Sequence, residues 1–358
     1  MSNTLAPVYY SAETVRSFLT WPLVIEAVES ALRAVVAMSV QSPNEPFVNQ
    51  PGRSFTSSKE PGQVLLTMPA FVGNYKLTSA GSGGDAANIP HSTLACKLVT
   101  SFSSNPQRDP PLPSINANIL LFSLETGELT TIMAGTDITT WRTVAASLVA
   151  TKHLYFRRFG PRAEREREIT VAIIGCGVQG QMHASAFCSQ FKVKQLNLYN
   201  RTIAKAQRLS EQLQQTPGFG SQTKITVCNF PWEAVQGSDV ICVATYSKVP
   251  LVYAADLRPD GCVHINAVGA GEIHYSEVAD NVYGLAQIYV DSYANAQSEL
   301  IGLAAPITAE LGSVIKHGTL PAESAVTIFQ SMGMASEDAC VAQAVQDAIL
   351  SSGRLPNL

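Results

Sequence analysis

The spacing of hydrophobic residues divides the chain into three regions. Between residues 23 and 36, apolar side chains recur at the intervals of an amphipathic helix. Short apolar runs then predict strands at 64–68, 94–100, 117–122 and 129–133. From residue 169 the pattern alternates, with strands expected at 169–174, 195–199, 224–228, 239–244, 262–267 and 287–290 and helices at 178–190, 202–214, 231–236 and 275–282. After about residue 300 the spacing is helical again, and a last amphipathic helix, Ala339–Leu350, is expected to begin at Ser336 or in the preceding turn.

This alternation predicts an α/β protein with two domains. A Rossmann doubly wound, dinucleotide-binding domain is expected over residues 153–319. An α+β domain for substrate binding and dimerisation is expected over residues 1–152, completed by the C-terminal helix within 320–358. The charged run 157–168 marks the boundary, and 358 residues are enough for both domains. The glycine-rich segment 73–92 is interpreted as a surface insertion in preference to a substrate lid.

The most informative motif is a glycine loop at the start of the alternating region. Gly175, Gly177 and Gly180 follow an apolar strand and open a helix, which is the context in which backbone N–H groups bind a dinucleotide pyrophosphate. The next strand ends in Asn200 and Arg201, where an NAD-preferring site would carry Asp or Glu. Because a guanidinium attracts a 2′-phosphate, the sequence predicts NADPH; a solvated surface arginine is the alternative for Arg201.

Three basic residues before the Rossmann unit are candidates for binding a carboxylate. Lys97 and Arg142 fall inside otherwise apolar segments, and Arg53 lies in a polar stretch upstream. A charged group removed from water needs a partner, and arginine can grip a carboxylate with two N–H groups. The partner is either a ligand or a protein Asp or Glu, and the residues alone leave both possibilities open.

Charge, apolar stretches and cysteines indicate which partners and which cell compartment to expect. A net charge of −4 gives no reason to expect nucleic acid or an anionic membrane. No apolar stretch approaches the ~20 residues of a membrane span, and residues 1–7 do not resemble a secretory signal. Seven scattered cysteines suggest reduced thiols in a cytoplasmic protein, with Cys176 a small residue in a crowded turn.

Other catalytic chemistries find little support in the sequence. The histidine and cysteine spacings match no metal site, and a GxSxG nucleophile motif is absent. His183 and His264 are interpreted as residues that satisfy local hydrogen bonds.

Together these motifs resemble the ornithine cyclodeaminase/μ-crystallin family over nearly the whole chain. The matching segments occur in order: 68–70, 97–99, 142–146, 150–152, 175–179, 200–202, 264–269, 289–292, 309–312, 329–334 and 337–338. Segments 73–92 and 157–168 look like insertions relative to that family. The resemblance implies a homodimer in which the N-terminal domain forms the subunit contact and the substrate site, while the Rossmann domain binds NAD(P).

The resemblance also implies roles for individual residues. Arg53 would bind the substrate carboxylate, Lys97 matches the active-site lysine, and Arg142 matches an arginine between substrate and cofactor. The cofactor set comprises Gly175, Gly177, Val178 and Gln179 at the pyrophosphate, Asn200, Arg201 and Thr202 at the 2′-phosphate, and Thr245, Val268, Ser331, Ser114 and Asn116 at further contacts. Lys205 is a further candidate for the cofactor site.

One departure from the family pattern favours a particular reaction. Cyclodeaminases, and the archaeal alanine dehydrogenases that share the fold, carry an Asp shortly after the strand that ends near Val268. Here that place reads Gly269–Glu272, and Gly271 cannot act as a base. μ-Crystallins also lack this Asp and resemble NADPH-dependent ketimine reductases.

The sequence therefore predicts NADPH-dependent reduction of a small cyclic ketimine carboxylate, such as piperideine-2-carboxylate or pyrroline-2-carboxylate. Lys97 is the candidate to supply the proton or to orient a water, with Glu272 and Glu299 as weaker alternatives. Two other readings stay open. One is a different enzyme of this fold, either an ornithine cyclodeaminase or an amino-acid or N-alkyl amino-acid dehydrogenase. The other is a non-catalytic binding protein for NADPH or thyroid hormone.

Overall fold

The computed structural model describes residues 6–36, 45–77, 90–216, 219, 223–269 and 273–353. The chain divides into two compact units. Unit 1 comprises Met1–Ala145 and Gly333–Leu358, and unit 2 comprises Ala146–Met332.

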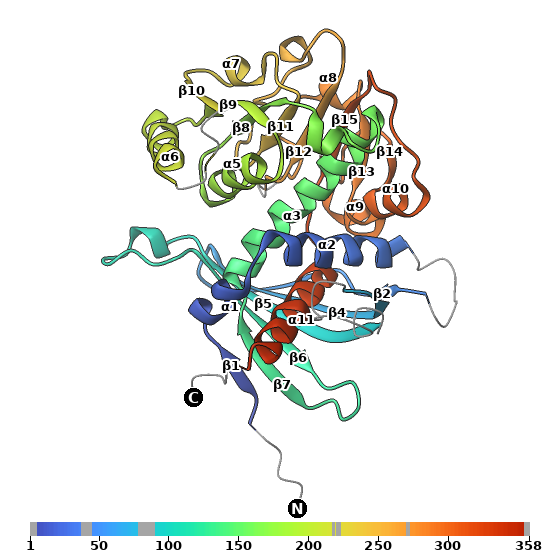
Figure 1. Ribbon diagram of the computed structural model, residues 1–358. Helices are drawn as coiled ribbons and strands as arrows, with labels where there is room; N and C mark the ends of the chain where they lie inside the picture. Colours follow the sequence, from blue (N-terminus) through green and yellow to red (C-terminus); the bar gives the residue numbers. More distant parts are fainter. Residues whose placement is uncertain are drawn as a thin grey trace, which may run out of the picture. The chain divides into compact units, whose positions relative to one another are not determined.

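Unit 1 is a mainly antiparallel sheet with helices on one face (Figure 1). The strand order is β1-β7-β6-β5-β4-β2, with β3 also paired to β4. The strands are β1 (Val8–Tyr10), β2 (Phe47–Asn49), β3 (Ser54–Ser57), β4 (Gln63–Tyr75), β5 (His91–Phe102), β6 (Ile115–Phe122) and β7 (Leu129–Ala134). The helices are α1 (Ala12–Phe18), α2 (Trp21–Val36), the short η3 (Asn105–Gln107) and the C-terminal α11 (Ala335–Ser351).

Side chains of the central strands alternate between the two faces of this sheet. On β5, Ala95, Lys97 and Val99 are buried, whereas Leu94 is 36% exposed. Successive strand residues point to opposite faces, so the buried set shares the face covered by α11. The cation of Lys97 therefore lies among the buried side chains of β5, on the face of the sheet that α11 covers.

The long strand β4 differs from the prediction, which placed its end before Pro69. The strand continues through Pro69 to Tyr75. On one side Pro69 lies opposite Cys96 of β5, and on the other it falls between the stretches of β4 that pair with β3 and with β2. Proline, which has no N–H to donate, is tolerated at such an unpaired edge position.

Unit 2 is a parallel sheet of the doubly wound type, which confirms the predicted fold class. Its strand order is β10-β9-β8-β11-β12-β15-β13-β14, and the order reverses at β8, the position where such folds bind nucleotides. The strands are β8 (Ile169–Ile174), β9 (Val193–Tyr199), β10 (Lys224–Cys228), β11 (Val240–Val243), β12 (Val263–Ala267), β13 (Gln287–Val290), β14 (Ile307–Glu310) and β15 (Val326–Gln330).

The helices of unit 2 connect these strands. They are α5 (Val178–Gln190), α6 (Ile203–Gln215), α7 (Pro231–Val235), α8 (Asp280–Tyr283), α9 (Tyr293–Glu299) and α10 (Leu311–His317), with the short turn η5 (Ala254–Asp256). Helix α3 (Thr136–Leu154) begins in unit 1 and continues into unit 2. The charged run 157–168 belongs to unit 2, where η4 (Phe156–Phe159) and α4 (Ala163–Glu166) occupy most of it.

The region after residue 275 differs most from the prediction. The helix expected at 275–282 is only Asp280–Tyr283, and the expected helical region after 300 contains strands β14 and β15. Strand β15 was missed because its Thr327 and Gln330 are polar, yet both are fully buried and hydrogen-bonded. Because β15 pairs with β12 and β13, the chain divides after Met332, whereas the sequence placed this boundary at 319/320. The other division follows Ala145, against an expected 152/153.

Two further segments bear on the predictions. Helix α11 begins at Ala335, in agreement with the expected start at Ser336 or in the turn before it. Of the proposed insertion at 73–92, residues 78–89 lie outside the described residues.

Candidate active site

The basic residues Lys97 and Arg142 meet two buried acids in unit 1. The Lys97 ammonium, on β5, lies 2.5 Å from Asp338 Oδ2 in the first turn of α11. Arg142, on α3, places Nη1 3.2 Å from Glu337 Oε2 and Nε 3.4 Å from Asp338 Oδ1. All four side chains are at most 8% exposed, so these pairs lie in a medium that screens charge weakly.

Arg53 completes the cluster from the loop before β3. Its guanidinium donates a hydrogen bond to the backbone oxygen of Gly333, at 3.0 Å. Gly333 has φ +80°, and a Cβ on it would collide with the Arg142 guanidinium, so glycine is required here. The structure thus brings together the three cations that the sequence proposed for the substrate.

The pKa of Lys97 is lowered to about 8. Burial is the main cause, and the nearby Arg142 and Arg53 act in the same direction, while Asp338 opposes them. A lysine with a pKa near neutrality can both hold and release a proton under ordinary conditions.

Sequence reasoning missed the roles of Glu337 and Asp338. Acidic residues in the first turn of a helix are common because they suit its dipole, and Glu337 Oε2 indeed accepts the N–H of Met334, at 3.3 Å. The available signal was two acids at the start of a helix whose other residues are mainly apolar. Of the two possible partners for Lys97 and Arg142, the structure shows a protein acid for each.

The glycine loop of unit 2 has the geometry expected for a pyrophosphate site. Gly175 has φ +102°, and a Cβ there would lie 2.5 Å from the Ala244 backbone oxygen. Gly177 caps α5 without a side-chain hydrogen bond, and a Cβ at Gly177 would meet no atom within 4 Å. The space beside Gly177, at the start of α5, is therefore open, which fits a phosphate group at a helix N-terminus.

The basic segment after β9 is tied to this loop. Asn200 Oδ1 accepts the N–H of Cys176 at 2.9 Å, and Asn200 Nδ2 donates to the Thr202 oxygen at 2.9 Å. Arg201 and Lys205 are exposed. Burial raises the pKa of the Cys176 thiol to about 12, so this cysteine is unreactive and serves as a small residue.

The remaining predicted cofactor residues fall into two groups. Thr245 and Val268 follow β11 and β12, and Ser331 follows β15, so all three lie at carboxyl ends of the parallel sheet. Ser114 and Asn116 belong to unit 1, just before β6 and within it.

The histidines and the other acids have separate roles. His183 and His264 are hydrogen-bonded on both ring nitrogens, as predicted, and burial lowers their pKa values to about 4 and about 3. Glu272 lies outside the described residues, and Glu299 lies 3.3 Å from His274 in unit 2.

Among the described residues, no group of His, Cys, Asp and Glu could hold a metal ion. None of the helices in the described part of the chain has the length and hydrophobicity of a membrane span.

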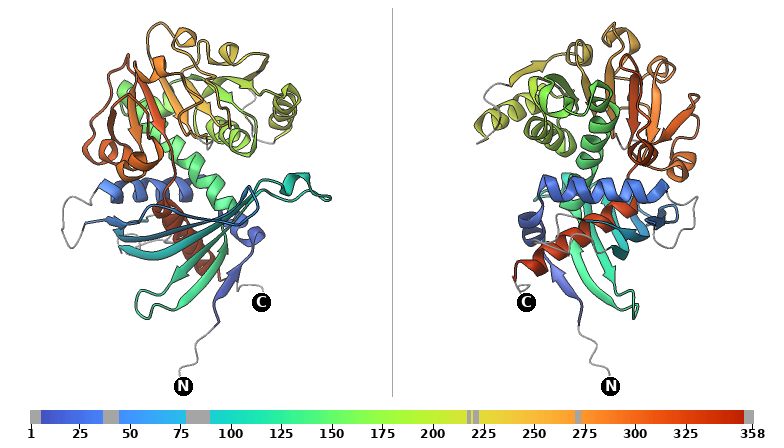
Figure 2. Two further views of the ribbon diagram at one scale, coloured as in Figure 1. Left: turned by 180° about the vertical axis from the view of Figure 1, so that it is seen from behind. Right: turned by 45° about the vertical axis from the view of Figure 1, so that its right-hand side comes forward.

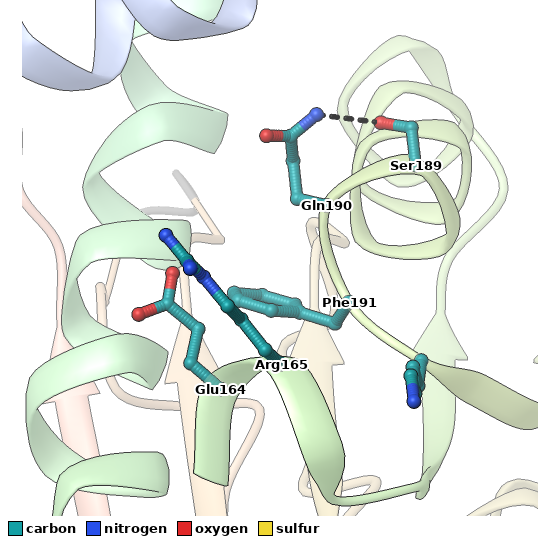
Figure 3. A pocket seen from close by; sticks show the side chains of 6 residues that line it. Glu164, Arg165, Ser189, Gln190 and Phe191 are labelled. Carbon is teal, nitrogen blue, oxygen red and sulfur yellow. Dashed lines mark hydrogen bonds between the residues drawn. The ribbon is translucent and has the colours of Figure 1, made fainter. Parts of the chain in front are cut away.

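A cavity of about 370 Å³ lies elsewhere in unit 2 (Figure 3). It is lined by Glu164, Arg165, Ser189, Gln190, Phe191 and Lys192. Helix α5 ends at Gln190 and begins beside Gly177, so this cavity lies at the opposite end of the helix from the glycine loop. It is therefore not the dinucleotide site.

Glu277 is a buried acid near the glycine loop, and sequence reasoning did not identify it. Its Oε1 accepts hydrogen bonds from the N–H of Thr245, at 2.8 Å, and from the Thr245 hydroxyl. The Thr245 side chain in turn lies against Gly175. Burial raises the pKa of Glu277 to about 7, although the hydrogen bonds from Thr245 oppose this.

The raised pKa of Glu277 predicts a pH-dependent stability. The folded state binds this proton more tightly than the unfolded state, so the free energy of unfolding falls as pH rises from about 4.5 to about 7. The shift corresponds to about 3 kcal/mol. Glu277→Gln should remove this loss, because an amide keeps an acceptor for Thr245 but does not ionise. Urea unfolding at pH 5 and pH 8 tests this, and an identical pH dependence in both proteins would contradict it.

The chain is similar over most of its length to known reductases. The chain is 33% identical over 354 residues to the ketimine reductase mu-crystallin of Mus musculus, with 98% of this chain and 99% of that protein covered. It is 31% identical over 274 residues to a Delta(1)-pyrroline-2-carboxylate reductase of Bacillus thuringiensis, with 73% and 78% covered. The structure of the Thermococcus litoralis Delta(1)-pyrroline-2-carboxylate reductase, in complex with NADH and L-proline, matches with a TM-score of 0.75 at 25% identity, covering 98% of this chain and 100% of that one.

The names of these relatives agree with the expectation of an NAD(P)H-dependent oxidoreductase. The family model for ornithine cyclodeaminase/mu-crystallin matches residues 11–353. The resemblance inferred from the sequence motifs is therefore confirmed, and the chain belongs to the ornithine cyclodeaminase/mu-crystallin family.

Proposed function

We propose that the protein reduces a small cyclic ketimine carboxylate to the cyclic amino acid with NADPH as the hydride source. Candidate substrates are piperideine-2-carboxylate and pyrroline-2-carboxylate. The observation that carries the proposal is the buried cluster in which Lys97 lies with Arg142 and Arg53. The names of the mouse and Bacillus relatives, a ketimine reductase and a pyrroline-2-carboxylate reductase, point to the same substrate class.

The chain has residues suited to a nicotinamide dinucleotide. Backbone N–H groups at Gly177, Val178 and Gln179 would hold the pyrophosphate. Further contacts would come from Gly175, Asn200, Thr202, Thr245, Val268 and Ser331, with Ser114 and Asn116 as additional candidates. When bound, the reduced nicotinamide supplies a hydride to the carbon of the C=N bond.

The choice of NADPH rests on Arg201 and Lys205. Both side chains are exposed, one just after β9 and the other in the first turn of α6. A cation after the second Rossmann strand favours a 2′-phosphate and offers little to a bare ribose hydroxyl.

The basic cluster would bind the substrate and supply its proton. Arg53, with Lys97 or Arg142, would hold the carboxylate, because a guanidinium matches its two oxygens. The nitrogen of the imine needs one proton when its carbon receives the hydride, and the Lys97 ammonium is the proposed donor. Lys97 is then left as a neutral amine and recovers a proton from solvent. Its pKa of about 8 suits this exchange near neutral pH.

We also propose a homodimer, supported by the second face of the unit 1 sheet. Among the described residues of unit 1, no helix covers this face, as the left view of Figure 2 shows. Two cross-strand rows on it are apolar: Phe71, Leu94, Phe122 and Pro69, Cys96, Leu120. Exposed apolar surface of this kind is typical of an interaction site, and a second copy of the same chain would bury it in an isologous contact.

Oxidation of NADPH by the cyclic imines tests the proposed reaction. Purified protein mixed with NADPH and either piperideine-2-carboxylate or pyrroline-2-carboxylate should lose the absorbance of the reduced nicotinamide at mildly acidic to neutral pH. No oxidation with either imine would overturn the proposal. Ammonia release from ornithine with NAD would indicate cyclodeamination, turnover of a keto acid with an amine would indicate an amino-acid dehydrogenase, and thyroid-hormone binding without turnover would indicate a binding protein.

Arg201→Ala tests the choice of cofactor. Loss of a charge-assisted contact to the 2′-phosphate should raise the KM for NADPH by about tenfold or more, with little change for NADH. Arg208→Ala is the matched control, because Arg208 is also exposed and lies farther along α6. Equal KM values for the two cofactors in the unmodified protein would refute the proposed preference.

Gly177→Ala tests the pyrophosphate site separately from the 2′-phosphate site. Gly177 has φ −77°, and a Cβ there meets no protein atom, so the variant should fold with stability within about 1 kcal/mol of the original. The added methyl would occupy the approach of the pyrophosphate and should weaken NADPH and NADH binding equally, by about tenfold or more. Titration by nucleotide fluorescence measures both, and unchanged affinity would argue against this loop as the site.

A further inference from the structure

We propose that Asp338 is a positioning residue, whose carboxylate holds the Lys97 ammonium in place and keeps it charged as the proton donor. The donor role rests on the proposed function. The pairing of Lys97 with Asp338 does not, so the two can be tested separately.

The surroundings of Lys97 explain why it depends on Asp338. Lys97 is 2% exposed and lies between Met68 of β4 and Ile119 of β6, so its strand neighbours offer it no charge. An isolated ammonium in such a place would lose its proton, because desolvation penalises the charged form. Asp338, 1% exposed, lies 2.5 Å from the nitrogen and opposes that loss.

The charged groups around Lys97 act in opposite directions on its pKa. Arg142 on α3 and Arg53 before β3 lower the pKa, while Asp338 on α11 raises it both through its charge and through its hydrogen bond. Glu337 faces Arg142 from the same turn of α11. Farther along the packed face lie Tyr75, Cys340, His91 and Asp347. Burial raises the pKa of Cys340, and the charge of Glu337 raises it further, so this group is not electrically isolated from the cluster.

Helix α11 gives its two acids different partners. Glu337 Oε2 accepts the N–H of Met334 and pairs with Arg142, so it closes the start of the helix. Asp338 follows one residue later, about 100° around the helix axis, and reaches Lys97. A second contact, Thr93 Oγ1 to Gln343 Oε1 at 3.2 Å, joins the same face of β5 to the next turns of α11 and holds the helix in register.

Asp338→Asn separates charge from shape. The amide keeps the size of the side chain and an oxygen that can accept from Lys97, but it removes the negative charge. We expect the alkaline limb of the kcat/KM profile for imine reduction to move about one pH unit lower, with activity at pH 6 nearly retained and activity at pH 8 reduced about fivefold. Asp338→Glu should restore the profile in part. A purely structural role would lower activity equally at all pH values.

The matched control is Asp347→Asn on the same helix. Asp347 lies 3.5 Å from His91, away from the basic cluster, and undergoes the same chemical change. Its pH profile should match that of the original protein. A shift as large in Asp347→Asn as in Asp338→Asn would contradict a specific role for Asp338.

The ionisation of Lys97 can be followed without any turnover. In protein with ¹³C-labelled lysine, the chemical shift of Lys97 Cε should titrate with a midpoint near pH 8. The midpoint should lie at lower pH in Asp338→Asn. The resonance is assigned by its absence in Lys97→Arg. An unchanged midpoint would overturn the proposal. If the midpoint moves but the unmodified protein reduces no imine, the pairing holds and the proposed reaction fails.

A measurement on the unmodified protein covers the case in which Asp338→Asn does not fold. The ¹³C resonance of the Asp338 carboxyl group should change at the same pH at which Lys97 loses its proton, because the carboxylate then no longer faces a positive charge. The absence of that shared step would equally refute the proposal.

Discussion

A buried ammonium group needs a negative charge beside it, and in unit 1 the carboxylate of Asp338 provides it. Together with Glu337 it lets Lys97 and Arg142 remain charged beneath a helix, where the strand neighbours of Lys97 are the apolar Met68 and Ile119. Removing one member of such a pair typically costs about 3–5 kcal/mol, because the remaining charge is left buried. The acids come from α11, so the basic cluster is complete only once the end of the chain has returned to the sheet of unit 1.

Unit 2 meets a different constraint, which is close approach of the backbone to a ligand. The loop after β8 needs a positive φ at Gly175 and open space above Gly177, and Asn200 ties this loop to the segment that carries Arg201. Glu277 supports the floor of the same region through Thr245. In the proposed reaction, unit 1 would supply the cations and the proton, and unit 2 would supply backbone N–H groups to the dinucleotide.

Much of the fold could be predicted because its signals are local. The strands β8, β9, β10 and β13 lie within a residue or two of their predicted limits. Strand β8 is the clearest of them, because a fully buried parallel strand appears as a nearly uninterrupted apolar run. The prediction failed at β15, where Thr327 and Gln330 break the apolar pattern. Both are fully buried and bonded to His264 and Tyr283, far away along the chain. It also failed at Pro69, which lies at a gap in the pairing of β4.

For the candidate site, the sequence by itself determined the glycine loop, the basic segment at Arg201 and the need of Lys97 and Arg142 for partners. Each of these follows from the residue types within a short stretch of chain. Only the tertiary structure decided which groups those partners are, and that Glu277 lies beneath Thr245. The physical reason is that an ion pair or a buried hydrogen bond depends on distances of a few ångströms in space, and an acid in a helix's first turn has the same local pattern whether it meets water or a lysine.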